Sequence, residues 1–410
     1  MIVGMPMPPE PFTDLPEPEG WDRIPLEDIF AAYHECRKNK RGSNGALRFE
    51  IDLEKNLVDL WEEINAGTWE PNPSTAFIVT KPVTREIFAA DFRDRIVHHL
   101  VIGRLDRLFE KLFIHDTYSC RKGKGTHFGV SRAERFVRRR DPAWVLKIDI
   151  RGYFMSIDRE RLFRKLAAFI EERYRGGDRE RIKELCRIIV FNDPTKDCVR
   201  RSPPKSWDGL PKDKSLFTAR EGCGLPIGNF TSQIFANFYL SEFDHFIKKG
   251  CRMTDYGRYV DDCILVHRSP AVLKKLIPKI TVYLKEELGL TLHPRKTYLQ
   301  PCGNGVRFLG CFVKPSHTVV NRRTMVNFGH SVGRYNGIAL DHKPDRDERS
   351  AFISSVNSYL GIVGHYKSYR QRKRVLLDGI SSLWHKHVVP SDGDFLKITK
   401  RKSFPKGAKR

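Results

Sequence analysis

The stretch YGRYVDDCILVHRS, residues 256–269, places two adjacent aspartates, Asp261 and Asp262, between two apolar runs. The β-branched and aromatic residues on both sides predict two strands joined by a tight turn at the aspartates. A partly buried carboxylate is unfavourable unless a cation or a metal ion compensates its charge. Asp is also common in ordinary turns. The stretch by itself therefore leaves two interpretations open, a structural hairpin and a metal site.

A second apolar stretch, AWVLKIDI at residues 143–150, predicts a strand that ends at Asp149. If this strand lies beside the hairpin, three carboxylates meet at one edge of a sheet. Mg²⁺ usually takes one or two carboxylates and leaves positions for water and phosphate oxygens. Two such ions about 4 Å apart can bind the attacking and leaving oxygens of an in-line phosphoryl transfer. Together the two stretches favour a metal site.

The charge of the chain indicates a polyanionic partner. Its 410 residues include 73 Lys and Arg against 50 Asp and Glu, a formal charge of +23, of which the basic residues at 397–410 supply seven. Such an excess gains affinity for nucleic acid by displacing phosphate counterions. No apolar run is long enough to span a membrane, no signal pattern opens the chain, and the nine cysteines include no Cys-x-x-Cys pair. We expect a cytoplasmic protein with free thiols and neither a membrane partner nor a zinc site.

The apolar periodicity predicts an α+β protein. Expected helices cover residues 26–38, 53–67, 93–113, 159–174, 227–247 and 273–289, with two or three more at 349–387. Paired strands are expected at 74–92 with a turn at 81–82, and a Pro-, Lys- and Asp-rich stretch at 192–220 predicts an inserted loop.

In order along the chain, these motifs resemble those of reverse transcriptases over roughly residues 75–365. That family carries a first Asp on a strand and a Tyr-x-Asp-Asp hairpin, here Asp149 and YVDD at 259–262. REIFAADFRDRIVHH (85–99) is similar to the fingers segment that holds the nucleotide phosphates, HPRKT (293–297) to a lysine-bearing motif, and FLG (308–310) to the primer grip. The resemblance implies a right-hand polymerase fold, with fingers, a palm of antiparallel sheet flanked by helices, and a helical thumb.

The expected boundaries are a poorly ordered arm at 1–20, fingers at 21–142, palm at 143–315, thumb at 316–390 and a basic tail at 391–410. The resemblance implies that Asp149, Asp261 and Asp262, with the Ile150 carbonyl, hold two Mg²⁺ ions, or Mn²⁺ in their place. Lys296 would contact or protonate the pyrophosphate leaving group. A solvated lysine after a turn is the alternative for Lys296.

The same resemblance assigns residues that bind the incoming dNTP. Phe154 matches a bulky ring that excludes a ribose 2′-OH. Arg85 and Lys81 would clamp the triphosphate, with plain surface charge as the alternative. The expected substrate-binding set is Lys81, Arg85, Ile150, Phe154, Ile227, Gly228 and Tyr259.

Residues 118–140 carry eight basic residues, one acid and several glycines. Gly-rich basic loops can cradle phosphates, so Arg121, Lys122 and Lys124 are expected to contact the template RNA, a solvated basic helix being the alternative. Phe308, Leu309 and Gly310 would hold the primer. Tyr359, in the thumb, is expected to pack in a helix bundle.

One motif departs from the general pattern. Most bacterial members have Gln-Gly-x-x-x-Ser-Pro where this chain has IGNFTSQ, residues 227–233. With RKGKGTH and NSYLG, this motif resembles the reverse transcriptases of diversity-generating retroelements, which are bacterial or phage-encoded. That family copies a template-repeat RNA into cDNA with errors at adenines, diversifies a target gene by mutagenic retrohoming, and has a small, basic, pentameric accessory protein as partner. Ile227 offers only apolar contact where Gln would hydrogen-bond, which predicts lower fidelity but does not explain why adenine is singled out.

Two alternatives stay open on the sequence. The first is another bacterial reverse transcriptase, of the retron, abortive-infection or intron-derived kind. The second is a non-catalytic RNA-binding protein on a polymerase scaffold. Retention of all three aspartates argues against the second, because buried acids without metal are destabilising.

Overall fold

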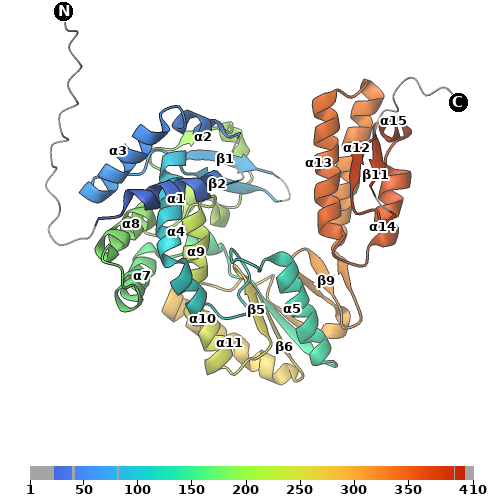
Figure 1. Cartoon of the computed structure of the whole chain (residues 1–410). Helices are drawn as coiled ribbons and strands as arrows, with labels where there is room; N and C mark the ends of the chain where they lie inside the picture. Colours follow the sequence, from blue (N-terminus) through green and yellow to red (C-terminus); the bar gives the residue numbers. More distant parts are fainter. Residues whose placement is uncertain (1–22, 39–41, 81–82, 392, 402–410) are drawn as a thin grey trace, which may run out of the picture. The chain divides into compact units, whose positions relative to one another are not determined.

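The computed structural model describes residues 23–38, 42–80, 83–391 and 393–401 (Figure 1). The predicted N-terminal arm at 1–20 and residues 402–410 of the basic tail lie outside this part. The chain divides into two compact units. Unit 1 comprises Met1–Cys120, Ile150–Arg252 and Pro278–His293, and unit 2 comprises Arg121–Asp149, Met253–Ile277 and Pro294–Arg410.

Unit 1 is mainly helical. Its helices are α1 (Leu26–Arg37), α2 (Asn44–Phe49), α3 (Leu53–Ala66), α4 (Phe92–Leu112), α6 (Tyr153–Ser156), α7 (Arg159–Arg173), α8 (Arg179–Phe191), α9 (Phe230–Tyr239), α10 (Ser241–His245) and the π-helical turn η4 (Phe246–Gly250). In its core, the ring of Phe109 on α4 lies 5.6 Å from that of Phe169 on α7 and 5.5 Å from that of Phe238 on α9. These aromatic contacts join three helices that are distant in sequence.

A small sheet completes unit 1, in the order β2-β1-β4. Its strands are β1 (Thr75–Val79), β2 (Arg85–Ala89) and β4 (Val199–Arg200), and β1 pairs antiparallel with β2, from Thr75 opposite Ala89 to Val79 opposite Arg85. The predicted strand pair is confirmed. β4 belongs to the predicted inserted loop, which continues through the 3₁₀ turns η1 (Pro204–Trp207), η2 (Lys212–Lys214) and η3 (Leu216–Thr218).

The predicted continuous helix at 227–247 is wrong at its start. Gly228 has a φ of +132°, a conformation that favours glycine, and Asn229 is extended, so α9 begins only at Phe230. The chain then passes through α10 and η4 instead of forming one α-helix. Residues 227–229 are consequently a loop next to β2, because the N–H of Phe88 donates to the Ile227 carbonyl at 2.8 Å.

Unit 2 contains the predicted palm strands. A four-stranded antiparallel sheet has the order β5-β6-β3-β7, formed by β5 (Tyr256–Tyr259), β6 (Asp262–His267), β3 (Trp144–Ile148) and β7 (Tyr298–Pro301). A second sheet consists of β8 (Val306–Phe308), β9 (Cys311–Val313) and β10 (Thr318–Val320), preceded by the 3₁₀ turn η5 (Cys302–Asn304). Helix α5 (Thr126–Arg139) also belongs to unit 2, and α11 (Pro270–Leu288) has residues in both units.

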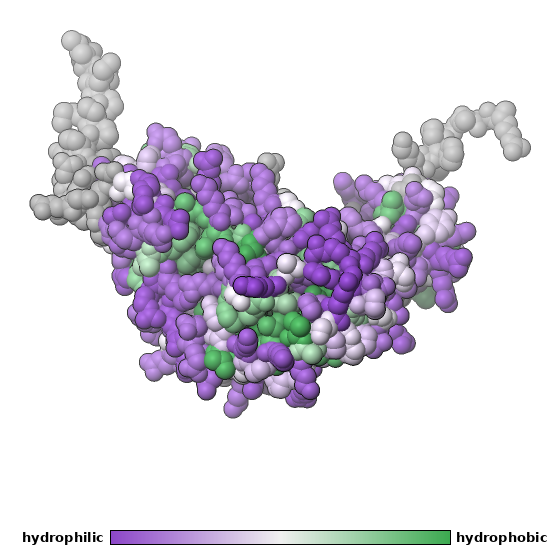
Figure 2. Space-filling model, turned by 90° about the horizontal axis from the view of Figure 1, so that it is seen from below, coloured by the Kyte–Doolittle hydropathy of each residue, from purple (hydrophilic) through white to green (hydrophobic). Residues whose placement is uncertain are grey.

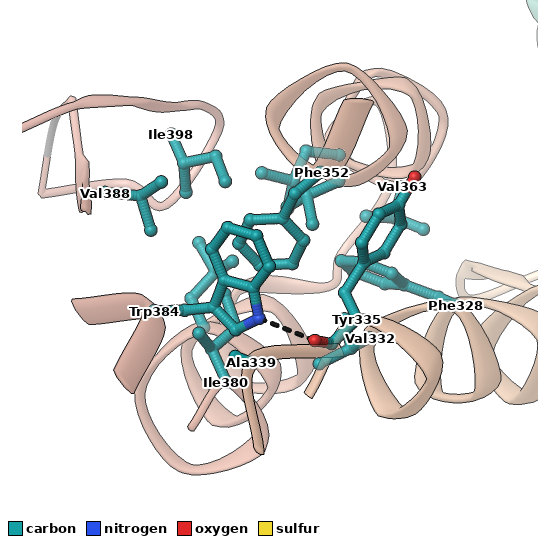
Figure 3. Close-up of a cluster of buried hydrophobic side chains, with 13 residues drawn as sticks. Phe328, Val332, Tyr335, Ala339, Phe352, Val363, Ile380, Trp384, Val388 and Ile398 are labelled. Carbon is teal, nitrogen blue, oxygen red and sulfur yellow. Dashed lines mark hydrogen bonds between the residues drawn. The ribbon is translucent and has the colours of Figure 1, made fainter. Parts of the chain in front are cut away.

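The C-terminal part of unit 2 is a helical module with its own core (Figure 3). It contains α12 (Arg322–Asp341), α13 (Arg346–Val363), α14 (Tyr369–Arg374), the π-helical turn η6 (Val375–Gly379), α15 (Ser382–His385) and the antiparallel pair β11 (Val388–Pro390) and β12 (Ile398–Lys400). Trp384 stacks on Phe352 at 4.1 Å and donates its indole N–H to the Tyr335 carbonyl at 2.8 Å. Tyr359 packs against this core, as predicted.

The surface is largely hydrophilic on the face shown in Figure 2, with smaller apolar areas between the polar ones. This agrees with a sequence in which 30% of the residues are charged. Within the residues that the structure describes, no helix is both long and apolar enough to cross a membrane.

Asp94, in the first turn of α4, is a buried carboxylate of unit 1. Its side chain is 1% exposed, and the N–H of Asn72 donates to Oδ2 at 2.8 Å. Burial raises the pKa of Asp94 from an ordinary value near 3.8 to about 7. The folded chain therefore binds more protons at Asp94 than the unfolded chain between about pH 4 and 7. Because of this difference, Asp94 makes the free energy of unfolding decrease as pH rises through this range.

We expect Asp94→Asn to weaken this pH dependence, because the amide keeps the shape of the side chain and carries no charge. The measurement is the melting temperature between pH 5 and 8. The matched control is Asp208→Asn at an exposed position. Its melting temperature should decrease with pH as that of the wild type does. An equal decline in the Asp94 variant would contradict the assignment.

Candidate active site

The hairpin of β5 and β6 presents Asp261 at its turn. Tyr259 pairs with Asp262, so the connecting loop consists of Val260 and Asp261. Val260 has a φ of +57°, which is unfavourable for a β-branched residue. The guanidinium of Arg258, which is fully buried, donates to the Val260 carbonyl at 2.8 Å. This contact stabilises the turn that carries the aspartate.

The register of β3 places a second carboxylate at the same end of the sheet. Ile148 is opposite Cys263 in the antiparallel pairing of β3 with β6. Asp149 follows Ile148 and Asp262 precedes Cys263, so their backbones are neighbours across the two strands. We call Asp149, Asp261 and Asp262 the acidic site. Unit 2 thus brings together the three aspartates that the sequence predicts to converge.

Two lysines contact the acidic site. Lys296 Nζ lies 3.1 Å from both carboxylate oxygens of Asp149. Lys147 on β3 forms an ion pair with Asp262 Oδ1. The sequence analysis missed Lys147, although a signal was present. A lysine inside an apolar strand, two residues before Asp149, must lie on the same face as that aspartate because side chains alternate along a strand.

The charges of the acidic site are not balanced by these lysines. Burial, and next the nearby charge of Asp149, raise the pKa of Asp261 to about 7. Burial also raises the pKa of Asp262, against the lowering effect of Lys147. Once all three carboxylates are ionised, they outnumber the two ammonium groups and leave a net negative charge in a partly buried place. The site therefore favours an additional cation.

The donor chemistry of the acidic site suits a hard divalent ion. Within the described ranges, no group of three or more His, Cys, Asp or Glu side chains is arranged to hold one metal ion. Mg²⁺ rarely uses so many protein ligands and takes one or two carboxylates together with water and substrate oxygens. In the structure, Lys147 and Lys296 contact two of the carboxylates that would serve as ligands.

We expect Asp261→Asn to raise the melting temperature of the metal-free protein at pH 8, because it removes the uncompensated charge. Added Mg²⁺ should raise the melting temperature of the wild type and have a smaller effect on the variant. Thermal unfolding is measured without Mg²⁺ and at Mg²⁺ concentrations that increase in ten-fold steps, which tests both effects. Asp341→Asn, an exposed acid of α12, is the control. Equal responses of wild type and Asp261→Asn to Mg²⁺ would refute cation binding here.

Unit 1 holds most of the predicted substrate-binding residues. Arg85 is exposed at the start of β2, and Ile150 is buried and bridges to Leu292. Phe154 and Ile227 are half-buried and pack against one hydrophobic cluster. The structure thus brings Phe154 and Ile227 together. Lys81 lies outside the described residues.

Gly228 has a specific steric reason to be glycine. A Cβ at this position would lie 2.6 Å from the Phe88 carbonyl oxygen and 2.9 Å from Ile87 Cγ2. Its φ of +132° is also rarely adopted by other residues. The close approach of the 227–229 loop to β2 therefore requires glycine here.

The predicted nucleic-acid-binding residues lie in two turns of unit 2. Arg121, Lys122 and Lys124 precede α5, in a turn where Gly123 and Gly125 have φ values of +73° and +117°. Lys122 is exposed, and Lys124 Nζ lies 5.5 Å from the ring centre of Phe128.

Phe308, Leu309 and Gly310 form the turn between β8 and β9, where Leu309 and Gly310 have positive φ. Phe308 is buried, and Lys147 Nζ lies 5.7 Å from the centre of its ring. Tyr259 is half-buried at the end of β5. The roles of all these residues in binding stay predictions.

The comparisons with known proteins identify the family. Residues 81–313, more than half of the chain, match the family described as reverse transcriptase (RNA-dependent DNA polymerase). The chain belongs to this family, and the expected α+β polymerase fold is confirmed. Reverse transcriptases in general use divalent metal ions, in agreement with the oxygen donors of the acidic site. No curated protein sequence is significantly similar to the chain.

Solved telomerase structures are similar to the chain at low identity. One is telomerase from Candida albicans with a fragment of telomeric RNA, at 12% identity and a TM-score of 0.45, covering 75% of this chain and 55% of that one. Another is apo telomerase from Candida tropicalis, at 11% identity and a TM-score of 0.47, covering 74% and 57%. The chain thus spans a little over half the length of these structures.

Proposed function

We propose that the chain is an RNA-directed DNA polymerase that extends a DNA primer with dNTPs at the acidic site. The observation that carries this proposal is the placement of Asp149 beside Asp262, with Asp261 in the adjacent turn. Two Mg²⁺ ions bound there would supply the positive charge that stabilises the attacking and leaving oxygens. The imbalance of charge described above supports this use of the three carboxylates.

The two lysines have different proposed roles. Lys296 has 54% of its side chain exposed beside Asp149 and would donate a proton to the leaving pyrophosphate. Lys147 is only 12% exposed and is held between Asp262 and the ring of Phe308. Lys147 therefore orients the carboxylate of Asp262 and does not act as an acid.

We expect Asp261→Ala combined with Asp262→Ala to lower primer extension on an RNA template by at least about a hundred-fold, because the ligands of the ions are lost. Extension of a labelled primer with Mg²⁺ and dNTPs measures the rate. The control is Asp341→Ala, which should extend like the wild type. Substantial extension by the double variant would exclude the acidic site as the catalytic centre, and inactivity of the wild type would favour a non-catalytic RNA-binding protein.

Within this class, we propose that the chain copies a template-repeat RNA into cDNA with errors directed to adenines, for diversification of a target gene. The support lies in residues 227–233. The Ile227 carbonyl already accepts the N–H of Phe88, and its side chain offers only apolar contact. A base pair beside it would receive no hydrogen bond from this side chain, which weakens discrimination between correct and incorrect pairs. The proposed partner is a basic, pentameric accessory protein.

We expect Ile227→Gln to reduce adenine-directed errors while cDNA yield stays substantial, because Gln offers a hydrogen-bonding group where Ile offers only apolar contact. Sequencing of cDNA made on an adenine-containing RNA template measures both quantities. Ile227→Val is the matched control and should keep the wild-type error spectrum. An unchanged spectrum in Ile227→Gln would refute the role of Ile227. Errors without preference for adenine in the wild type would point to another bacterial reverse transcriptase.

A further inference from the structure

The segment 192–220 is fixed to the β-sheet of unit 1. The carboxylate of Glu86 on β2 is 1% exposed and accepts three hydrogen bonds from this segment. They come from Trp207 Nε1 at 2.7 Å, Ser215 Oγ at 2.7 Å and the Leu216 N–H at 2.6 Å. A buried carboxylate is stable only with such partners. Glu86 therefore holds the segment in one place, although the segment has little regular secondary structure.

Aromatic packing adds to this attachment. The ring of Phe217 lies 5.4 Å from that of Phe88 on β2 and 6.2 Å from that of Trp207. The guanidinium of Arg200 on β4 lies 4.4 Å from the centre of the Phe217 ring and 5.6 Å from that of Trp207. Arg200 thus covers both rings with cation–π contacts.

The segment packs on the same hydrophobic cluster as two predicted substrate-binding residues. We call this the Phe88 cluster; its buried members are Ala76, Phe88, Met155 and Leu216. Phe154, Trp207, Phe217 and Ile227 pack against it.

The backbones of the two substrate-binding residues are held at the same place. The Phe154 carbonyl accepts the N–H of Leu225 at 2.9 Å, and the Ile227 carbonyl accepts that of Phe88 at 2.8 Å. Their side chains are half-buried, so one part of each packs inward and another part faces outward. The packing of the inward part therefore depends on the side chains with which the segment 192–220 fills the space at the Phe88 cluster.

The segment also contacts the turn that leads to Phe154. Arg151 Nε donates to Asp213 Oδ2 at 3.2 Å. A Cβ on Gly152 would lie 2.6 Å from the Asp213 carbonyl oxygen, so the two backbones are in close contact there. The segment thus packs on the cluster that contacts Phe154 and, through Asp213, contacts the two residues at the start of the turn that leads to it.

We infer that the segment 192–220 is a positioning element for nucleotide selection, in which Trp207 and Phe217, through the Phe88 cluster, hold the side chains of Phe154 and Ile227 in the orientation that selects the incoming nucleotide. The inference rests on the proposed polymerase activity and on the expectation from the sequence that the ring of Phe154 excludes a ribose 2′-OH. Selective contacts require side chains that are held by their surroundings to within a fraction of an ångström. Trp207 and Phe217 act through the Phe88 cluster and are positioning residues, without contact to the substrate.

The test compares incorporation of a dNTP with that of the matching rNTP, as the ratio of the two kcat/KM values, in the full-length chain. Phe217→Ala should lower this ratio by about ten-fold, because a displacement of about 1 Å at a selecting group changes rates by one to two orders of magnitude. Phe217→Tyr keeps the ring and should keep the wild-type ratio. Lys205→Ala, an exposed change in the same segment, should leave the ratio unchanged.

A second variant removes the risk that Phe217→Ala does not fold. Trp207→Phe keeps an aromatic ring but removes the indole N–H that Glu86 accepts, together with part of the indole ring system. It should still fold, with a melting temperature below that of the wild type because Glu86 loses one of its three donors, and should show a lower ratio. A wild-type ratio in Trp207→Phe and in folded Phe217→Ala would overturn the positioning role.

Phe154→Ala distinguishes the role of Phe154 in excluding ribonucleotides from the positioning role of Trp207 and Phe217. It should admit ribonucleotides, which supports the expected gate at Phe154, while the Trp207 and Phe217 variants decide on the positioning role. If Phe154→Ala loses selectivity and the Trp207 and Phe217 variants keep it, the inference alone is overturned. If Phe154→Ala still excludes ribonucleotides, the proposed role of Phe154 is wrong, and the inference is overturned with it.

Discussion

The antiparallel pairing of β3 with β6 is the constraint on which the acidic site depends. Side chains alternate along a strand, so a shift of one residue in this register would move Asp149 to the opposite face of the sheet. Leu146 and Ile148 are fully buried on one face, whereas Lys147 and Asp149 lie on the other, so such a shift would place charged groups where apolar residues are buried. Hydrophobic burial thus fixes the position of a charged group at the end of the same strand.

Two features of the acidic site are locally destabilising. Partly buried carboxylates lie close together, and Val260 adopts a backbone conformation that is unfavourable for a β-branched residue. Arg258, Lys147 and Lys296 compensate part of this through hydrogen bonds and ion pairs. Concentration of unfavourable features at one place is typical of a functional site, where geometry is maintained by the surrounding fold.

Unit 1 shows a different kind of constraint. Its 192–220 segment contains only short 3₁₀ turns and a two-residue strand, yet its polar and aromatic residues are tied to β2. A buried carboxylate with three donors has few alternative arrangements, since losing any one donor leaves an unsatisfied group. A segment without regular secondary structure can therefore hold one defined conformation, as a helix does, when the residues that it contacts are buried.

Local patterns were sufficient to predict several elements. The strand pair β1–β2, the helices α3 and α4, and the hairpin at Asp261 follow from alternation, from 3.6-residue periodicity and from Gly67 at a helix end. The prediction of a helix from residue 227 was wrong, because α9 begins only at Phe230. The apolar periodicity does not reveal that the backbone at Gly228 must approach β2 closely.

The sequence by itself determined the three aspartates and the family motifs, because these depend on residue type and spacing along the chain. Only the tertiary structure decided that Lys147 pairs with Asp262, that Glu86 fixes the 192–220 segment, and that this segment packs on the same cluster as Phe154 and Ile227. Such contacts join residues that are 115 to 130 positions apart in the first two cases. Their strength depends on burial and on donor and acceptor geometry, which no local pattern of the sequence contains.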